Sequence, residues 1–484
     1  MRREKAAKMR AKGVDPYPHL FEPTCSSKEL LEQWAEMKPG EASEAEARIA
    51  GRMMSRRLMG KSAFAHLQDD AGQIQIYVRQ NMVGDDAYDD FKTLFDIGDI
   101  LGVEGTIFRS RMGELTVEAY NVTMLSKALR PLPEKFHGLT DVETRYRQRY
   151  LDLIMNREVR DVMETRTRLV RAIQGYMDGR GFLEVETPIL QPVYGGAAAR
   201  PFTTRHNVLD ELLYLRISNE LYLKRLIVGG MERVYEFSKD FRNEGIDRSH
   251  NPEFTMMEAY QAYADYETMM ELVENMSAQA VEAAVGSLKT EWQGKPLDWT
   301  PPWRRMSMAE SIQEATGMDI LQCGEAELKA ELDQRGVEIP AHVNSWGLLA
   351  MELFEAAVER HLFQPTIVYD YPLETSPLAK KKRGDERFVE RFEAFVGGME
   401  LGNAYSELND PDDQRARLEA QAVQRERGDD ESHMFDEDFI RALEYGMPPT
   451  GGIGVGIDRL AMLATNSASI RDVIFFPQMR THTP

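Results

Sequence analysis

Two segments of alternating character, joined by a short turn, constrain the fold of this chain more than any other feature of its sequence. Residues 234–242 place a polar side chain at every second position, and strand geometry puts such positions on one face of a sheet. These residues are Glu236, Ser238, Asp240 and Arg242. Residues 253–260 follow the turn and place Phe254, Glu258 and Tyr260 on one face in the same way. Any one of them could be a surface ion pair or a core aromatic, but the set predicts an antiparallel pair that presents cationic, anionic and aromatic groups together.

A glycine-rich segment, residues 450–460, predicts a strand that enters a helix at Asp458. Glycine permits close approach of the backbone to a ligand, and Arg459 at the helix start can meet a phosphate. Alone the segment is weak evidence, since glycine-rich strands also serve tight packing. It lacks the third glycine of a dinucleotide fingerprint. Residues 60–62 resemble the end of a phosphate-binding loop, but Ser55 stands where that loop needs glycine.

Two carboxylates seven residues apart, Glu393 and Glu400, lie near a pair of glycines. Hard cations such as Mg²⁺ take carboxylate oxygens together with substrate phosphates, although two solvated surface acids are the simpler alternative. Further polar side chains share a strand face that Glu400 does not share, which predicts a kink near Gly402. They are Asn403, Tyr405 and Glu407.

The rest of the chain divides into two regions of different periodicity. Residues 47–126 contain short β-rich runs separated by turns, which suits a small barrel of the oligonucleotide-binding (OB) kind. A linker with Pro131 and Pro133 follows, and the region beyond it predicts long strands with helices between them. A strand over residues 182–187 ends at Pro188. Helices are expected over residues 160–177, 220–228, 266–286 and 347–361.

Charge and composition narrow the class of protein. The net charge is −21, from 80 acidic and 59 basic residues, which favours a cationic ligand if acids line a cleft. Basic residues nevertheless gather in residues 2–12 and 48–66, a pattern that suits a nucleic-acid footprint or a solvated face. The acidic run over residues 411–440 is interpreted as a solvated face.

Several other classes are excluded by the residues that the sequence lacks. Two cysteines, Cys25 and Cys323, provide neither a disulfide framework nor a cysteine zinc site. No apolar run reaches the ~18 residues of a membrane span, and the basic N-terminus has no apolar core of a secretory signal. We therefore expect a cytoplasmic protein with no membrane partner.

With these residues assembled, the chain resembles the class II aminoacyl-tRNA synthetases, and most closely the bacterial lysyl-tRNA synthetases. Three segments within residues 51–477 carry the resemblance, namely residues 181–188 (GFLEVETP), 241–254 (FRNEG through HNPEF) and 454–459 (GVGIDR). The resemblance implies an α+β fold, with an N-terminal OB-fold β-barrel followed by a class II synthetase catalytic domain on a six-stranded antiparallel sheet with flanking helices. The implied divisions are an N-terminal basic arm (1–46), an OB-fold anticodon-binding domain (47–128), a linker (129–150) and the catalytic domain (151–484).

The resemblance also implies an activity, that of a lysine–tRNA ligase. L-lysine would attack the α-phosphate of ATP, and the resulting lysyl-adenylate would pass its lysyl group to the 3′ end of tRNA(Lys). ATP is then a substrate, Mg²⁺ the cofactor, and a second copy of the chain the partner in a homodimer. Phosphoryl-type transfer depends on positioning and charge neutralisation more than on a protein nucleophile, which suits a site rich in Arg and Glu.

The resemblance assigns roles to individual residues. The catalytic residues are Arg242 and Arg459. The ATP-binding residues are Arg242, Glu244, His250, Phe254, Glu393 and Arg459, with Phe254 and Arg459 on the two faces of adenine and Glu244 at its amino group. Glu393 and Glu400 would hold Mg²⁺. In the barrel, Arg57, Phe64 and Gln75 would bind the anticodon, although a core position is the alternative for Phe64.

The resemblance implies three groups of lysine-binding residues, according to whether they contact the ε-ammonium, the α-amino group or the carboxylate of lysine. The full set is Gly196, Glu220, Arg242, Glu258, Tyr260, Asn403, Tyr405 and Glu407. Glu258, Glu407 and Tyr260 would bind the ε-ammonium group. Gly196 and Glu220 would bind the α-amino group, and Asn403 the carboxylate.

Three alternatives remain open at this point. An aspartyl- or asparaginyl-tRNA synthetase would share the fold, but like-charge repulsion from Glu258 and Glu407 disfavours aspartate. The lysine ligase that modifies an elongation factor resembles only the catalytic half, so the predicted barrel argues against it. A non-catalytic tRNA-binding relative would be expected to have lost parts of the motifs that carry Arg242 and Arg459.

Overall fold

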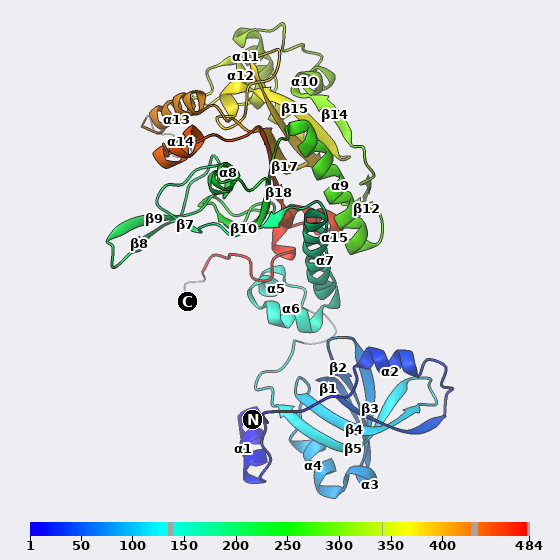
Figure 1. The fold of residues 1–484 in the computed structure, drawn as a ribbon. Helices are drawn as coiled ribbons and strands as arrows, with labels where there is room; N and C mark the ends of the chain where they lie inside the picture. The colour runs from blue at the N-terminus through cyan, green and yellow to red at the C-terminus, as the bar shows by residue number, and fades with distance from the viewer. Residues whose placement is uncertain (134–138, 341, 427–433, 482–484) are drawn as a thin grey trace. The chain divides into compact units, whose positions relative to one another are not determined.

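The computed structural model describes residues 1–133, 139–340, 342–426 and 434–481 (Figure 1). The chain forms two compact units, Met1–Gly138 and Leu139–Pro484. Part of the acidic run over residues 411–440 lies outside the described residues. Among the described residues, no helix is both long and apolar enough to cross a membrane.

The N-terminal unit is built on a closed barrel with the strand order β1-β2-β3-β5-β4. Its strands are β1 (Ala42–Met59), β2 (Ser62–Gln68), β3 (Gln73–Arg79), β4 (Ile100–Arg109) and β5 (Leu115–Ser126). Small and apolar residues alternate with polar ones, so that Ala63, Ala65 and Leu67 of β2 are buried while the residues between them reach the outer face. Short helices accompany the barrel, namely α2 (Ser27–Gln33), α3 (Gln80–Val83) and α4 (Asp85–Thr93). The expected OB-type barrel is confirmed.

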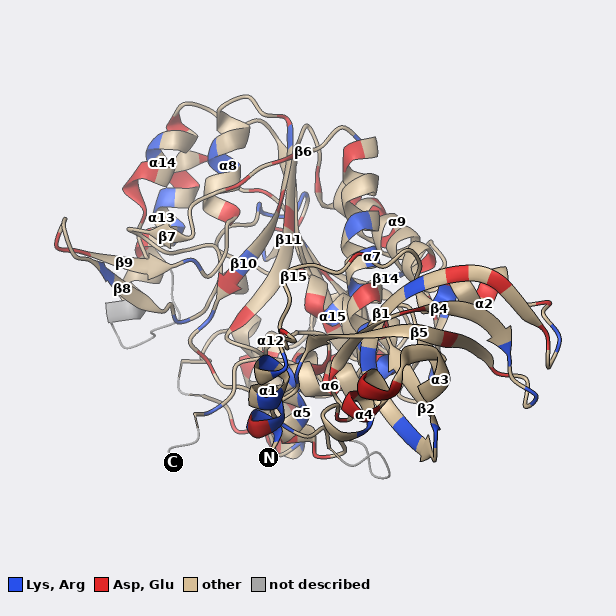
Figure 2. Ribbon diagram, turned by 90° about the horizontal axis from the view of Figure 1, so that it is seen from below, with Lys and Arg blue, Asp and Glu red and all other residues tan. Residues whose placement is uncertain are grey.

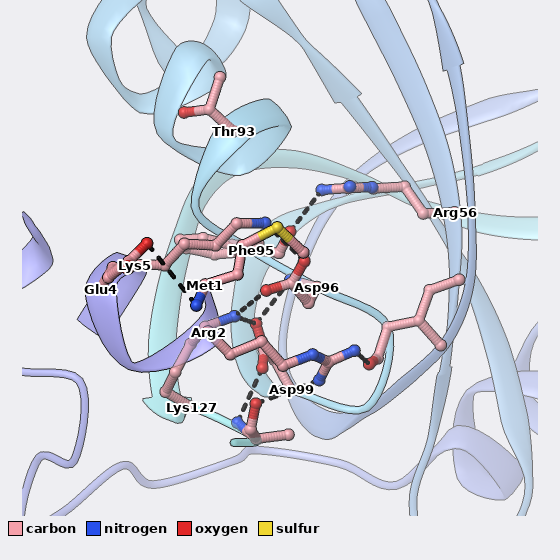
Figure 3. A network of polar contacts seen from close by, with 12 residues as sticks. Met1, Arg2, Glu4, Lys5, Arg56, Thr93, Phe95, Asp96, Asp99 and Lys127 are labelled. Carbon is pink, nitrogen blue, oxygen red and sulfur yellow. Dashed lines mark hydrogen bonds and ion pairs between the residues drawn. The ribbon is translucent and has the colours of Figure 1, made fainter. Parts of the chain in front are cut away.

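Helix α1 (Arg2–Ala11) uses part of its basic charge to attach itself to the barrel unit (Figure 3). Arg2 donates to the carbonyl of Ala128 at 3.1 Å, and Lys5 lies 2.6 Å from Asp96. Lys127, which is fully buried, joins the same carboxylate at 2.6 Å. Figure 2 shows Lys and Arg along α1. The basic run is therefore partly neutralised within the chain, and its role as a nucleic-acid footprint stays a prediction for the exposed remainder.

The C-terminal unit contains a sheet of eight strands in the order β14-β15-β16-β17-β18-β11-β10-β6. The strands are β14 (Arg304–Ser307), β15 (Thr366–Pro372), β16 (Phe388–Val396), β17 (Met399–Ser406), β18 (Thr450–Gly456), β11 (Glu253–Ala262), β10 (Arg233–Phe241) and β6 (Leu183–Glu184). The six strands from β15 to β10 pair antiparallel, as expected. The edge strands β14 and β6 pair parallel and extend the sheet beyond the expected six. The strand expected over residues 182–187 pairs only at Leu183 and Glu184, because the chain leaves the sheet edge before Pro188.

Helices pack on both sides of this sheet (Figure 1). On one side lie α7 (Arg157–Gly179), α9 (Tyr266–Val285) and α15 (Ile457–Thr465), and on the other α8 (Glu220–Val228), α13 (Pro411–Glu426) and α14 (Glu437–Glu444). The remaining helices are α5 (Val142–Arg147), α6 (Arg149–Met155), α10 (Met308–Thr316), α11 (Glu325–Gln334) and α12 (Trp346–Ala357). The helix expected over 347–361 ends at Ala357, and a 3₁₀ turn, Glu359–His361, continues it. A small sheet of β7 (Leu190–Gln191), β8 (Thr203–His206) and β9 (Glu211–Leu215) and a hairpin of β12 (Lys289–Trp292) and β13 (Lys295–Asp298) complete the unit.

Strand parity separates the core from the site. Met257 and Ala259 of β11 and Ile453 and Val455 of β18 join the apolar core under α7, α9 and α15. Glu258 of β11 and the alternate glycines of β18 belong to the opposite face. The polar residues that the sequence places at alternate positions are therefore gathered on one side of one sheet.

Candidate active site

A pocket lies between the β10–β11 hairpin, β17 and the β18–α15 junction. Its lining includes Arg242, Glu244, His250, Phe254 and Arg459, five of the six expected ATP-binding residues, together with Glu400. The sixth, Glu393, is not among its lining residues. Glycines of β17 and β18 also line it, at Gly402, Gly454 and Gly456, so the sheet floor approaches a ligand closely.

The cationic side chains of this pocket already have partners. The guanidinium of Arg242 lies over the Phe254 ring, 5.1 Å from its centroid. Arg459 donates to the Glu400 carbonyl at 2.7 Å and lies 3.2 Å from the Glu400 carboxylate. A second nitrogen of Arg459 lies 3.4 Å from His250 Nε2. The arrangement in which Phe254 and Arg459 enclose adenine stays a prediction, since here the guanidinium over Phe254 belongs to Arg242.

The start of helix α15 is fixed by a buried carboxylate, Asp458. Asp458 accepts a hydrogen bond from the backbone N–H of Thr255 at 2.7 Å and another from Arg166 at 2.7 Å. These two bonds connect β11 and α7 to the turn that carries Arg459. The sequence carries no signal for Arg166, because it lies 292 residues from its partner and reads as one more charge on an amphipathic helix.

The two candidate magnesium ligands have different surroundings. Glu393 is buried and accepts hydrogen bonds from Tyr371 at 2.9 Å and Arg391 at 2.5 Å, and burial raises its pKa to about 7. Glu400 lines the pocket. The kink expected near Gly402 is confirmed, since the β16–β17 register shifts there and leaves Leu401 without a partner.

This pair of carboxylates fits a magnesium ion that completes its coordination with substrate phosphates and water. Among the described residues there is no cluster of three or more His, Cys, Asp or Glu side chains that would form an all-protein cage. Mg²⁺ commonly binds through one or two carboxylates, so the chemistry of Glu393 and Glu400 suits it.

A cluster of buried acidic side chains, Glu220, Glu258 and Glu407, lies on the same face of the sheet and is called the acidic cluster. Glu258 accepts hydrogen bonds from Ser218 at 2.9 Å and from Tyr260 at 3.1 Å. Burial, together with the nearby carboxylates of Asp240 and Glu220, raises the pKa of Glu258 to about 8. Burial likewise raises the pKa of Glu407 to about 8, although Lys224 opposes the rise. These carboxylates are poised to accept a positive charge, because a cation would relieve the cost of ionising them in a buried site.

Two glycines let side chains of this region lie close to the backbone. Gly196 has φ +90°, and a Cβ there would stand 2.7 Å from Ser218 Oγ. A Cβ on Gly452 would stand 2.1 Å from Glu407 Oε1. A side chain at either position would therefore displace Ser218 or Glu407.

The remaining expected lysine-binding residues belong to two hydrogen-bonded groups and to the first pocket. Asn403 accepts from Arg391 at 3.1 Å and donates to the Tyr405 hydroxyl at 3.1 Å. Glu220 is buried and binds Lys224, a residue that no sequence motif pointed to, and Lys224 also contacts Glu407. Arg242 instead lines the pocket described first.

The three expected anticodon residues lie on neighbouring strands of the barrel. Phe64 is half-buried on the outer face and stacks on Tyr77, with ring centroids 4.3 Å apart. Arg57 is exposed and is opposite Phe64 in the β1–β2 register. Gln75 bonds Glu114 at 2.5 Å and Thr116 at 2.8 Å. Tyr77 was missed, although its aromatic type at alternate spacing from Gln75 is the signal that could have found it.

Comparisons with known proteins identify the family to which these two units belong. Residues 141–480 match the model of the class II tRNA synthetases (D, K and N), and residues 47–125 match that of an OB-fold nucleic acid binding domain. The chain belongs to the class II tRNA synthetase family (D, K and N).

Curated relatives narrow this assignment. The chain is 56% identical to the lysine–tRNA ligase of Pelotomaculum thermopropionicum over 99% of this chain and 94% of that protein. It is 53% identical to the lysine–tRNA ligase of Moorella thermoacetica, over 99% and 97% of the two chains. It is 51% identical to that of Bacillus subtilis, over 99% and 96%. Within its family the chain belongs with the lysine–tRNA ligases.

Proposed function

We propose that this protein activates L-lysine with ATP and transfers the lysyl group to tRNA(Lys), using the pocket and the acidic cluster on one face of the C-terminal sheet. The observation that carries the proposal is their adjacency. Gly454, which lines the pocket of Arg242 and Phe254, pairs in register with Glu258 of the acidic cluster. A nucleotide and a cationic amino acid can therefore lie side by side on neighbouring strands.

The first step forms a bond between a lysine carboxylate oxygen and the α-phosphorus of ATP, and pyrophosphate leaves with the electrons of the broken P–O bond. Arg242 neutralises phosphate charge, and Phe254 and Arg459 lie on the two faces of the adenine ring. Glu393 and Glu400 would hold Mg²⁺, which when bound neutralises phosphate charge. In the second step the terminal ribose hydroxyl of the tRNA attacks the lysyl carbonyl and AMP leaves.

Lysine selection rests on buried negative charge. Glu258 and Glu407, with the Tyr260 hydroxyl, receive the ε-ammonium group, since a charged donor is matched best by desolvated carboxylates. Gly196 and Glu220 receive the α-amino group, and Asn403 with Tyr405 lies toward the carboxylate. An acidic substrate such as aspartate is rejected by the same charges.

The barrel supplies a surface for single-stranded bases of tRNA(Lys). Phe64 and Tyr77 expose a stacked pair of rings on the outer face, and Arg57 adds positive charge beside them. Aromatic stacking with basic residues is the usual way of binding unpaired bases. We assign Gln75 to hydrogen bonding with a base edge in the same place.

Three further features belong to this proposal. A homodimer is supported by apolar side chains that are about half exposed on the short strands β6, β7 and β9, at Leu183, Leu190 and Leu212. A cytoplasmic location follows from a role in supplying ribosomes. The division into an arm (1–46), a barrel (47–128), a linker (129–150) and a catalytic domain (151–484) stays a prediction.

The decisive experiment is amino-acid-dependent ATP–pyrophosphate exchange without tRNA, over all twenty amino acids, with and without Mg²⁺. We expect exchange with lysine alone, its loss on removal of Mg²⁺, and its loss in Arg242→Gln. The surface variant Glu437→Gln, which removes a carboxylate paired with Arg415, serves as the matched control and keeps full exchange. Exchange with aspartate or asparagine would overturn the lysine assignment, and folded protein with no exchange would overturn the activity.

A further inference from the structure

Lys224 of helix α8 is a charged residue buried in the acidic cluster, and the proposed reaction does not use it. Its side chain is fully buried, and its Nζ lies 2.5 Å from Glu220 Oε1 and 2.5 Å from Glu407 Oε2. Burial alone would lower the pKa of Lys224, but the carboxylates of Glu220 and Glu407 raise it above its ordinary value. The side chain is therefore an ammonium group held between two carboxylates.

Stability alone does not explain this arrangement. Desolvating an ammonium group and two carboxylates costs several kcal/mol per ion, and apolar residues of similar volume often replace buried ion pairs without loss. The neighbouring core positions of the helix, Leu221 and Leu223, are apolar. A charge at position 224 therefore calls for a functional explanation.

The buried groups of the acidic cluster suit a ligand with two ammonium groups. Three buried glutamates, Glu220, Glu258 and Glu407, lie in this cluster, and Lys224 is paired with two of them. Burial raises the pKa of Glu258 and of Glu407 to about 8, so a bound ammonium group would favour their ionised forms. Glu407 Oε1 is buried and accepts no hydrogen bond from any described residue, so it remains available to a ligand.

Lys224 also connects the two ends of the proposed lysine site. Glu220 is assigned to the α-amino group and Glu407 to the ε-ammonium, and Lys224 binds both carboxylates. A single rigid bridge between them fixes their separation. A substrate shorter by one methylene group would leave one buried carboxylate without its ammonium partner.

We propose that Lys224 is a positioning residue that sets specificity for lysine over shorter diamino acids, by fixing where the carboxylates of Glu220 and Glu407 lie relative to each other. This inference rests on the proposed function. It concerns a residue that acts through two carboxylates rather than through contact with the reacting atoms. Its effect belongs to amino-acid binding and leaves the ATP side of the sheet unchanged.

The test compares Lys224→Met and Lys224→Arg with a control on the same helix, in lysine- and ornithine-dependent ATP–pyrophosphate exchange. Methionine keeps a long side chain and removes the charge, whereas arginine keeps the charge and changes its reach. The control is Arg225→Met, because Arg225 pairs with Asp436 and Asp438 of the neighbouring α14 region and faces away from the pocket.

We expect Lys224→Met to raise the KM for lysine roughly 10- to 100-fold, with kcat changed only a few-fold and the KM for ATP unchanged. One methylene group is worth roughly 10- to 200-fold in a shaped pocket, so the ratio of kcat/KM for lysine over ornithine should fall at least ~10-fold. Lys224→Arg should also lose discrimination, because its guanidinium holds the carboxylates at a different separation. Arg225→Met should match the wild type in every constant.

Each other result decides against a specific claim. A wild-type lysine KM and an unchanged lysine-over-ornithine ratio in Lys224→Met would overturn the inference. A parallel loss of ATP binding, measured by equilibrium dialysis, would indicate a structural role and overturn it equally. If Lys224→Met does not fold, Lys224→Arg tests the inference in its place, since an unchanged lysine-over-ornithine ratio in that variant would refute the positioning role of Lys224. Wild-type protein without lysine-dependent exchange would overturn the proposed function itself.

Discussion

The most direct test of lysine binding at the acidic cluster is Glu407→Gln, which keeps the size of the side chain and removes its charge. In the folded protein Glu407 is buried, its Oε2 lies 2.5 Å from Lys224 Nζ, and its Oε1 accepts no hydrogen bond from the described residues. Lys224 keeps its contact with Glu220 in the variant, so no buried ammonium is left alone. The substitution therefore changes what a bound lysine meets more than what holds the fold.

The expected size of the effect follows from one charge-assisted hydrogen bond. Such a bond contributes about 1.5–3 kcal/mol, and 1.4 kcal/mol is a factor of ten in affinity. Lysine binding should therefore weaken roughly 10- to 150-fold. The ATP pocket contacts none of the altered atoms, since Glu407 is not among its lining residues, and the KM for ATP should stay within about two-fold.

Steady-state ATP–pyrophosphate exchange measures both constants, with lysine varied at saturating ATP and ATP varied at saturating lysine. Glu437→Gln is the matched control, because it makes the same chemical change at a surface carboxylate. An unchanged lysine KM in Glu407→Gln would refute the assignment of the ε-ammonium site. An equal rise in the KM for lysine and the KM for ATP would refute the claim that Glu407 acts on lysine binding separately from ATP binding.

Four further predictions test the other parts of the site. Phe64→Ala should lower tRNA aminoacylation ~10-fold or more while sparing exchange, since stacking contributes about 1–3 kcal/mol per base; equal loss of both activities would place Phe64 in the fold alone. Phe254→Ala should raise the KM for ATP roughly 10-fold, because it removes the ring that lies under Arg242, and an unchanged KM would count against an adenine platform. Gly452→Ala should abolish lysine-dependent exchange but retain ATP binding in dialysis, because its Cβ would lie 2.1 Å from Glu407 Oε1; normal exchange would disprove the placement of lysine there. Burial raises the pKa of Glu258 and of Glu407 to about 8, above the ~4.3 of an unfolded glutamate, so their contribution to stability is complete below pH ~4.3 and is lost as pH rises through about 8. Because bound lysine offsets that loss, lysine should raise the melting temperature more at pH 8.5 than at pH 6.5. Equal increases at the two pH values would refute this prediction.

Much of the site was predictable because its signals are local. Alternation along residues 234–242 and 253–260 placed the polar side chains on one face, and the pairing of β10 with β11 confirms the antiparallel arrangement. The helix expected over 220–228 coincides with α8. The kink near Gly402 was also predictable, because a change of strand parity requires an extra residue.

Other features were out of reach of periodicity. The parallel edge strand β14 is too short to stand out from a loop, and the strand expected over residues 182–187 is reduced to the two residues of β6. The basic N-terminal run read as a free surface, yet Lys5 is paired with Asp96, 91 residues along the chain. The burial of Glu393 beside Arg391 and Tyr371 likewise depends on how strands β15 and β16 pair.

Which side chains could act together was predictable from the sequence alone, because side chains share a face at every second residue of a strand and about every 3.6 residues of a helix. Which charges are buried depends on the tertiary structure. Lys224 reads as an ordinary helical lysine until α8 packs against the sheet and brings it to Glu407, 183 positions later. The same holds for Arg166 and Asp458. A charge behaves differently in water and in a closed low-dielectric pocket, and that difference arises from contacts between segments that the local pattern does not relate.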